Sequence, residues 1–131
     1  MGDNAKAAVQ RLGLKDMINF CQRFFSQGFD KATFFESCGV ADLVATCAGG
    51  RNARCAKAFA AANGTKTLQE LEAELLNGQK LQGPATANEV NVLLRQNNCV
   101  NEFPVFTAVY LIGQGQMQCS EMVDFIKSHT Q

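Results

Sequence analysis

Hydrophobic residues recur at three- and four-residue steps along most of this chain, which is the spacing of an amphipathic helix. The pattern is longest between residues 5 and 25, where Asp3 or Asn4 can serve as the N-cap and Gly28 follows the end. No segment alternates in the way that a strand does. The spacing predicts a helical turn at 33–36 and helices over 40–47, 52–62, 68–76, 86–94, 105–112 and 122–125. We therefore expect a compact all-α domain of about seven or eight helices.

Capping residues indicate where several of these helices begin. Thr67–Glu70 and Thr86–Glu89 both have the spacing of a capping box, in which threonine accepts a backbone amide and glutamate reaches back. Each box is expected to begin a helix. Pro104 suits the first turn of the helix that follows it, and Ser120 is expected to cap the last one. Between the two boxes lies a polar loop, residues 77–84, which is rich in hydrogen-bond donors.

Length and composition fit a single domain that spans residues 1–131. The chain is 47% hydrophobic and has ten phenylalanines and no tryptophan, which is enough apolar material for a core. The phenylalanine-rich segment from Phe20 to Phe35 is expected to lie in that core.

The charge balance bears on the partners of the protein. Twelve basic side chains balance twelve acidic ones, so there is no overall field to attract nucleic acid or an anionic membrane. No run approaches the ~20 apolar residues of a transmembrane helix, and the polar start at Met1–Lys6 is unlike a signal peptide. We expect a cytoplasmic protein that binds neither nucleic acid nor membrane, in which any anion is bound locally.

Cysteine and histidine suggest no metal site and no disulfide framework. There is no CxxC pair, and the only histidine, His129, lies near the end of the chain without a nucleophile close to it in sequence. In a protein without a signal peptide, free thiols buried as small apolar side chains are the simplest interpretation. The cysteines in question are residues 21, 38, 47, 55, 99 and 119.

The segment Gly49–Asn52 is the first candidate for a binding site. Two glycines let the backbone approach a ligand, and the helix expected after them offers unpaired amides at its positive end, which suits a phosphate. Arg51 would add a planar fork that can bind two oxygens, and Asn52 an amide donor. The alternative is an ordinary helix end followed by a new helix, since glycine is common after a helix.

Other polar residues fall near this segment. Asp42 and Thr46 are four residues apart on the preceding helix, so they share a face and could bind the hydroxyls of a small polyol; otherwise they are solvated surface residues. Lys80 and Gln82 in the polar loop could reach a second anion or amide, or serve only solubility. Gly113–Gly115 lacks the third glycine and the preceding strand of a dinucleotide-binding fingerprint.

Two longer stretches carry a family resemblance. They are Asp42–Asn52, which reads DLVATCAGGRN, and Glu74–Pro84, which reads ELLNGQKLQGP. With the start of the chain and Glu102–Phe106, they resemble NAD-dependent glycerol-3-phosphate dehydrogenase of the eukaryotic cytosolic type, over essentially the whole chain. The resemblance implies hydride transfer between NADH and dihydroxyacetone phosphate, which gives glycerol 3-phosphate. It further implies a two-domain, homodimeric enzyme whose helical, substrate-binding C-terminal half this chain resembles.

The resemblance also implies roles for individual residues. By motif position, Arg51 and Asn52 would hold the substrate phosphate, and Asp42 and Thr46 would line its hydroxyl and carbonyl end. The residues implied to face NAD are Arg51, Lys80 and Gln82.

The family's Rossmann half and its two active-site lysines lie upstream of the part that this chain resembles. One of those lysines is the general acid for the ketone oxygen. Lys6 is the counterpart of neither, and Met1 is interpreted as a fragment boundary. We therefore expect no catalytic residue within residues 1–131, poor binding of NAD by this chain alone, and no activity without the other half.

Two further hypotheses stay open. The chain is alternatively a non-catalytic binding or dimerisation module, because surface that packs on another domain in the resembling enzymes would be exposed apolar area. It is alternatively a structural helical domain that retains the phosphate-binding motif without using it.

Overall fold

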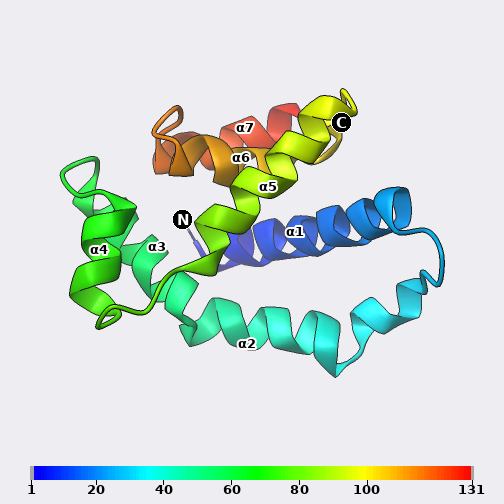
Figure 1. The fold of residues 1–131 in the computed structure, drawn as a ribbon, viewed down its shortest axis with the longest axis horizontal. Helices are drawn as coiled ribbons and strands as arrows, with labels where there is room; N and C mark the ends of the chain where they lie inside the picture. The colour runs from blue at the N-terminus through cyan, green and yellow to red at the C-terminus, as the bar shows by residue number, and fades with distance from the viewer. Residues whose placement is uncertain (1, 131) are drawn as a thin grey trace.

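The structure, a computed structural model, describes residues 2–130 and confirms the all-α fold class (Figure 1). Its α-helices are α1 (Asp3–Phe24), α2 (Asp42–Gly49), α3 (Arg51–Ala62), α4 (Leu68–Leu75), α5 (Gln82–Gln96), α6 (Pro104–Gly113) and α7 (Met122–Ser128). Short 3₁₀ helices form η1 (Lys31–Phe35), η3 (Val100–Glu102) and η4 (Cys119–Glu121), and a π-helical turn forms η2 (Ser37–Ala41). Within the described residues there is no strand, and no helix is long and apolar enough to cross a membrane.

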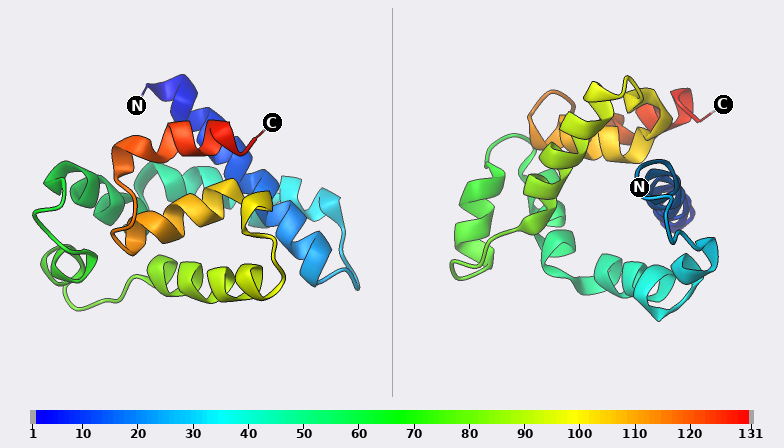
Figure 2. Two further views of the ribbon diagram at one scale, coloured as in Figure 1. Left: turned by 90° about the horizontal axis from the view of Figure 1, so that it is seen from above. Right: turned by 45° about the vertical axis from the view of Figure 1, so that its right-hand side comes forward.

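The long helix α1 organises the arrangement of the others. It packs against α6, which in turn contacts α5 and α7, so these helices form one body above α1 in Figure 1. Below α1 lies α2, which leads through a single residue into α3, and α3 pairs with α4 at one end of the molecule. The further views in Figure 2 show that α3 and α4 stand apart from the α6 and α7 pair.

The centre of the core lies where α1, α5 and α6 meet. Leu94, Cys99 and Phe103 are almost fully buried there, and Phe20 of α1 packs edge-on against Phe103 with ring centroids 6.0 Å apart. Two further buried clusters consist of Val105, Ala108 and Ile126, and of Cys55, Leu76 and Leu81. The third cluster joins α3 to the loop that precedes α5, and thereby positions the segment discussed below.

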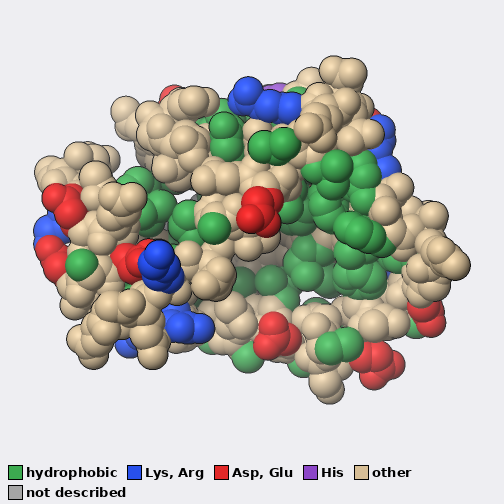
Figure 3. Space-filling model, in the orientation of Figure 1, with side chains coloured by type: hydrophobic (Ala, Val, Ile, Leu, Met, Phe, Trp, Pro, Cys, Tyr) green, Lys and Arg blue, Asp and Glu red, His purple; other side chains and the backbone are tan. Residues whose placement is uncertain are grey.

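The expectation that the whole phenylalanine-rich segment is buried is wrong. Phe25 is 63% exposed and Phe35 is 60% exposed, because they follow the end of α1 or lie in η1, where no other helix covers them. Val44 of α2 is 57% exposed as well. We call these three residues the apolar face. Figure 3 shows hydrophobic side chains gathered in a hollow over the region of α1 and α2.

The cysteines also differ from the expectation. All six are free thiols, but only Cys55 and Cys99 are buried, while Cys38 is exposed and the remaining three are half-buried. The small apolar interpretation therefore holds for two positions and not for the others.

Helix starts follow the predictions in part. The capping box Thr67–Glu70 is formed, with the Glu70 amide donating to Thr67 Oγ1 at 3.2 Å, and Pro104 occupies the first position of α6. Thr86 begins no helix, because α5 already starts at Gln82, with Leu81 as its N-cap. Ser120 caps nothing either, since the capping glutamate, Glu121, accepts instead from the Gln118 amide, at 2.7 Å. Asp3 and Asn4 both lie inside α1, whose N-cap is Gly2.

Candidate anion-binding site

Gly50 is the single residue between α2 and α3. Its amide donates to the Thr46 carbonyl at 2.9 Å and its own carbonyl accepts from the Arg54 amide at 3.0 Å, so one helix ends and the next begins on the same residue. A Cβ at this position would lie 2.8 Å from the Thr46 carbonyl oxygen, which explains the glycine. No side chain among residues 2–130 caps the start of α3. The first amides of α3 therefore have no intrahelical acceptor and are available to an anion.

Arg51 is the first residue of α3 and its side chain is exposed. Its guanidinium Nη1 donates to Gln79 Oε1 at 3.2 Å, which connects the start of α3 to the loop before α5. The remaining guanidinium donors stay available. The prediction of Arg51 as an anion ligand fits this position, whereas Gln79 was missed, because nothing in its local sequence distinguishes it from the other amides of the polar loop.

Asn52 lies next along α3 and contacts the start of α5. A Cβ built on Gly83 would lie 2.9 Å from Asn52 Oδ1 and 3.3 Å from its Cγ, so the carboxamide rests almost directly on the Gly83 backbone. The contact brings two helix starts together. The sequence did not predict this role for Gly83, because the residue that contacts it lies 31 positions earlier in the chain, on another helix.

The loop that carries Lys80 and Gln82 is anchored between them. Leu81 is only 8% exposed and its amide donates to Glu72 Oε2 at 3.2 Å. Lys80 and Gln82 on either side are exposed. The loop therefore presents both predicted polar side chains outward from a fixed backbone point, beside the start of α3.

Asp42 and Thr46 lie on α2 as predicted, four residues and about one helical turn apart, and both are exposed. Thr46 is bonded through its carbonyl to Gly50 and so adjoins the start of α3. Asp42 is one turn further away, in the first turn of α2. The structure thus joins Thr46, Arg51 and Asn52 at one junction, and leaves Asp42 on the approach to it.

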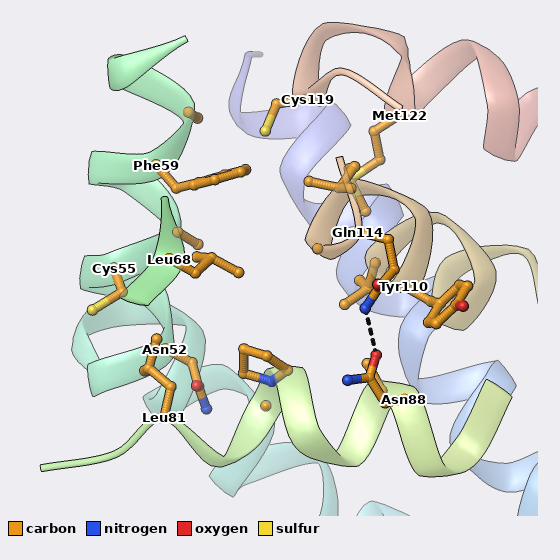
Figure 4. A pocket seen from close by; sticks show the side chains of 18 of the residues that line it. Asn52, Cys55, Phe59, Leu68, Leu81, Asn88, Tyr110, Gln114, Cys119 and Met122 are labelled. Carbon is orange, nitrogen blue, oxygen red and sulfur yellow. Dashed lines mark hydrogen bonds between the residues drawn. The ribbon is translucent and has the colours of Figure 1, made fainter. Parts of the chain in front are cut away.

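A cleft of about 760 Å³ opens beside this junction (Figure 4). Its lining is largely apolar, with Phe59 of α3 and Leu68 of α4 facing Met122 across the opening. Asn88 of α5 accepts a hydrogen bond from the Gln114 side chain at 2.8 Å on one wall. Asn52 also lines this cleft, so its carboxamide lies between the start of α3 and an apolar cavity.

The fold and the junction define a helical domain that offers backbone amides, a guanidinium and a carboxamide to an anion, next to a helix with hydroxyl and carboxylate groups. Residues 1–124 match the family model described as NAD-dependent glycerol-3-phosphate dehydrogenase C-terminus. The chain belongs to this family.

Individual relatives agree with the family assignment. The chain is 52% identical over 129 residues to the cytoplasmic glycerol-3-phosphate dehydrogenase [NAD(+)] of Drosophila melanogaster, covering 98% of this chain and 35% of that protein. It is 54% identical over 128 residues to the human glycerol-3-phosphate dehydrogenase 1-like protein, covering 98% and 36%. The chain therefore spans about a third of the length of the curated relatives it matches.

Solved structures share its fold. The glycerol-3-phosphate dehydrogenase of Saccharomyces cerevisiae superposes with a TM-score of 0.88 at 44% identity, over 96% of this chain and 35% of that one. The structure of DsGPDH of Dunaliella salina gives a TM-score of 0.90 at 41% identity, over 100% of this chain and 23% of that one. These likenesses cover essentially every helix described above.

Proposed function

We propose that this chain is the substrate-binding part of an NAD-dependent oxidoreductase that interconverts dihydroxyacetone phosphate and glycerol 3-phosphate. The observation that carries the proposal is the α2–α3 junction, where unpaired helix amides, Arg51 and Asn52 adjoin one another. Family membership and the activity for which the relatives are named support the choice of substrate. The Drosophila melanogaster relative, which is named as cytoplasmic, supports a cytoplasmic location.

Different residues bind the two ends of the substrate. The dianionic phosphate accepts hydrogen bonds from the amides at the start of α3, from Arg51 and from the Asn52 carboxamide. The hydroxyl and carbonyl end lies toward α2, where Thr46 donates and the Asp42 carboxylate accepts from a hydroxyl. Holding a three-carbon substrate at both ends fixes the carbon that exchanges hydride, which is the contribution of a binding domain to the rate.

The cofactor of the complete reaction is NAD, which supplies or accepts the hydride when bound. The residues present fit it: Arg51, Lys80 and Gln82 offer exposed cationic and amide donors beside the substrate site. Because Gln79 already binds Arg51, the loop is held against the start of α3 without a ligand. We propose that this chain alone binds NAD poorly and does not turn over substrate.

Titration of glycerol 3-phosphate into the chain, followed by NMR, tests the phosphate site. Arg51→Ala should weaken binding by about 1.5–3 kcal/mol, the contribution of a charged hydrogen bond. Lys57→Ala is the matched control, because it removes one exposed positive charge from the same helix further from its start. Equal affinities for Arg51→Ala and the unaltered chain would disprove the proposed site. Measurable turnover by this chain would disprove the proposed division of labour.

A second function, self-association, is favoured by the apolar face. Phe25, Phe35 and Val44 expose large hydrophobic side chains on neighbouring elements, and such patches mark protein interfaces. We propose that the chain forms a homodimer through this face. Sedimentation at several concentrations should detect a dimer that Phe35→Ser weakens and that Val92→Ser, on exposed α5 surface, leaves intact. A strictly monomeric chain would rule this out.

A further inference from the structure

Two helix starts meet where Asn52 contacts Gly83. Asn52 is the second residue of α3 and Gly83 is the second residue of α5. Apart from its chain neighbours and the backbone of its own helix, the three heavy atoms nearest to a Cβ on Gly83 all belong to the Asn52 carboxamide: Oδ1 at 2.9 Å, Cγ at 3.3 Å and Nδ2 at 3.6 Å. Real Cβ atoms essentially never lie as close as the first of these distances.

A positive φ does not explain the glycine at this position, although Pro84 follows it and would crowd the Cβ of a helical residue before it. The glycines with positive φ are residues 28, 64, 78 and 115, and Gly83 is not among them. It lies in the first turn of a helix, where alanine is normally the better residue because it loses less backbone entropy on folding. Besides easing the contact with Pro84, the glycine provides room for the Asn52 side chain.

The contact also differs from that of the other tightly placed glycine in the site. A side chain at Gly50 would collide with a backbone carbonyl, which cannot move without disturbing the helix end. Apart from its chain neighbours, a Cβ at Gly83 would collide with the end of a flexible side chain and not with a backbone carbonyl. A substitution at Gly83 should therefore change the position of one carboxamide and leave the fold intact.

We infer that Gly83 is a positioning residue, whose missing side chain holds the Asn52 carboxamide beside the start of α3 so that it can donate to a bound phosphate. This inference rests on the proposed function. The carbonyl oxygen Oδ1 is the atom nearest to Gly83, and Nδ2 lies farther away at 3.6 Å, so the NH₂ group is the part of the carboxamide that is left to donate to a phosphate. A methyl group at Gly83 turns the carboxamide away and removes that donor.

The experiment is a double-mutant cycle with Gly83→Ala and Asn52→Ala, in which inorganic phosphate and glycerol 3-phosphate are titrated into the chain and followed by NMR. Each single variant should lose about tenfold or more in affinity, and the double variant should lose no more than either. Gly113→Ala is the matched control, since Gly113 also lies in a helix and an added Cβ there meets no atom within 4 Å.

Unchanged affinity in Gly83→Ala would overturn the inference, and so would losses that add in the double variant, because Gly83 would then act through something other than Asn52. The Asn52 side-chain NH₂ resonances are read in the same spectra. They should shift in Gly83→Ala and stay in place in Gly113→Ala. If the unaltered chain binds neither ligand, the proposed function fails together with the phosphate role of Gly83. In that case the Asn52 NH₂ resonances alone test whether Gly83 positions the carboxamide. Resonances that do not shift in Gly83→Ala would overturn that role.

Discussion

Asp16 is the only buried carboxylate among residues 2–130, with 3% of its surface exposed. Its Oδ2 accepts from the Val105 amide at 2.8 Å and from the Phe106 amide at 3.3 Å, so a side chain of α1 caps the start of α6. Burial raises the pKa of Asp16 from 3.8 to about 6, although both amide bonds oppose the shift. The Asp16 carboxylate therefore links α1 to α6, but keeping this buried group ionised near neutral pH costs free energy.

The first prediction concerns the pH dependence of this contact. Because the folded-state pKa lies above the unfolded one, the folded chain holds a proton between about pH 4 and 6 that the unfolded chain has lost. The contribution of Asp16 to the free energy of unfolding is thus fully present below pH 4 and falls as the pH rises through 6. The free energy of unfolding, measured relative to Asp16→Asn, should fall by up to about 3 kcal/mol between pH 4 and 7.

Denaturant titrations at several pH values measure that difference. Asp124→Asn removes an exposed carboxylate and controls for the loss of a negative charge. A constant difference in the free energy of unfolding between the unaltered chain and Asp16→Asn over this pH range would contradict the prediction.

The candidate site could be predicted at the residue level only where the signal was local. Arg51 and Asn52 follow a glycine pair at a helix start, and that pattern is visible in a dozen residues of sequence. Gln79 and Gly83 belong to the site through contacts with α3 that span about thirty residues of chain. No spacing rule brings such pairs together, because their proximity depends on how α3, α4 and α5 pack.

At the level of elements, one sequence pattern gave two different outcomes. In the box at Thr67, the Thr67 amide donates to Glu70 Oε2 at 2.7 Å and these bonds lower the pKa of Glu70. The same spacing at Thr86 falls inside α5. Pro84 is tolerated there because a proline in the first turn lacks only an amide that would have no partner. Leu81 is buried and its amide is bonded to Glu72, and this tertiary contact fixes the start of α5 several residues before Thr86.

The second prediction uses these two threonines as a matched pair. Thr67→Ala should lower the free energy of unfolding by about 1 kcal/mol, the usual loss for an N-cap side chain. Thr86→Ala should leave it unchanged or raise it by a few tenths of a kcal/mol, because alanine is the better residue inside a helix. Thermal or urea unfolding of both variants checks this. Equal losses in the two variants would show that Thr86 also acts as a cap.

For the molecule as a whole, the periodicity predicted the helices but not their packing. The sequence predicts one apolar stripe for each helix, but it does not predict which other helix packs against that stripe. Phe20 and Phe25 look alike in sequence, but one packs between Phe24 and Phe103 and the other is mostly exposed. The cleft beside Asn52 arises for the same reason, since α3 with α4 and α6 with α7 diverge.

The third prediction tests where the centre of the core lies. Leu94 of α5 has no exposed surface and packs with Phe103, so Leu94→Ala should lower the free energy of unfolding by about 2–5 kcal/mol. Val92→Ala on the same helix serves as the control, because Val92 is 56% exposed and should lose about 1 kcal/mol at most. Urea titration measures both. Comparable losses would place the core elsewhere.

The buried position of Leu81 has a consequence for dynamics. Its amide is bonded to Glu72 and its side chain is packed, so its hydrogen should exchange with solvent more slowly than that of the exposed Lys80. A ligand contacted by Lys80 and Gln82 therefore orders two side chains and not a whole loop, which keeps the entropic cost of binding low.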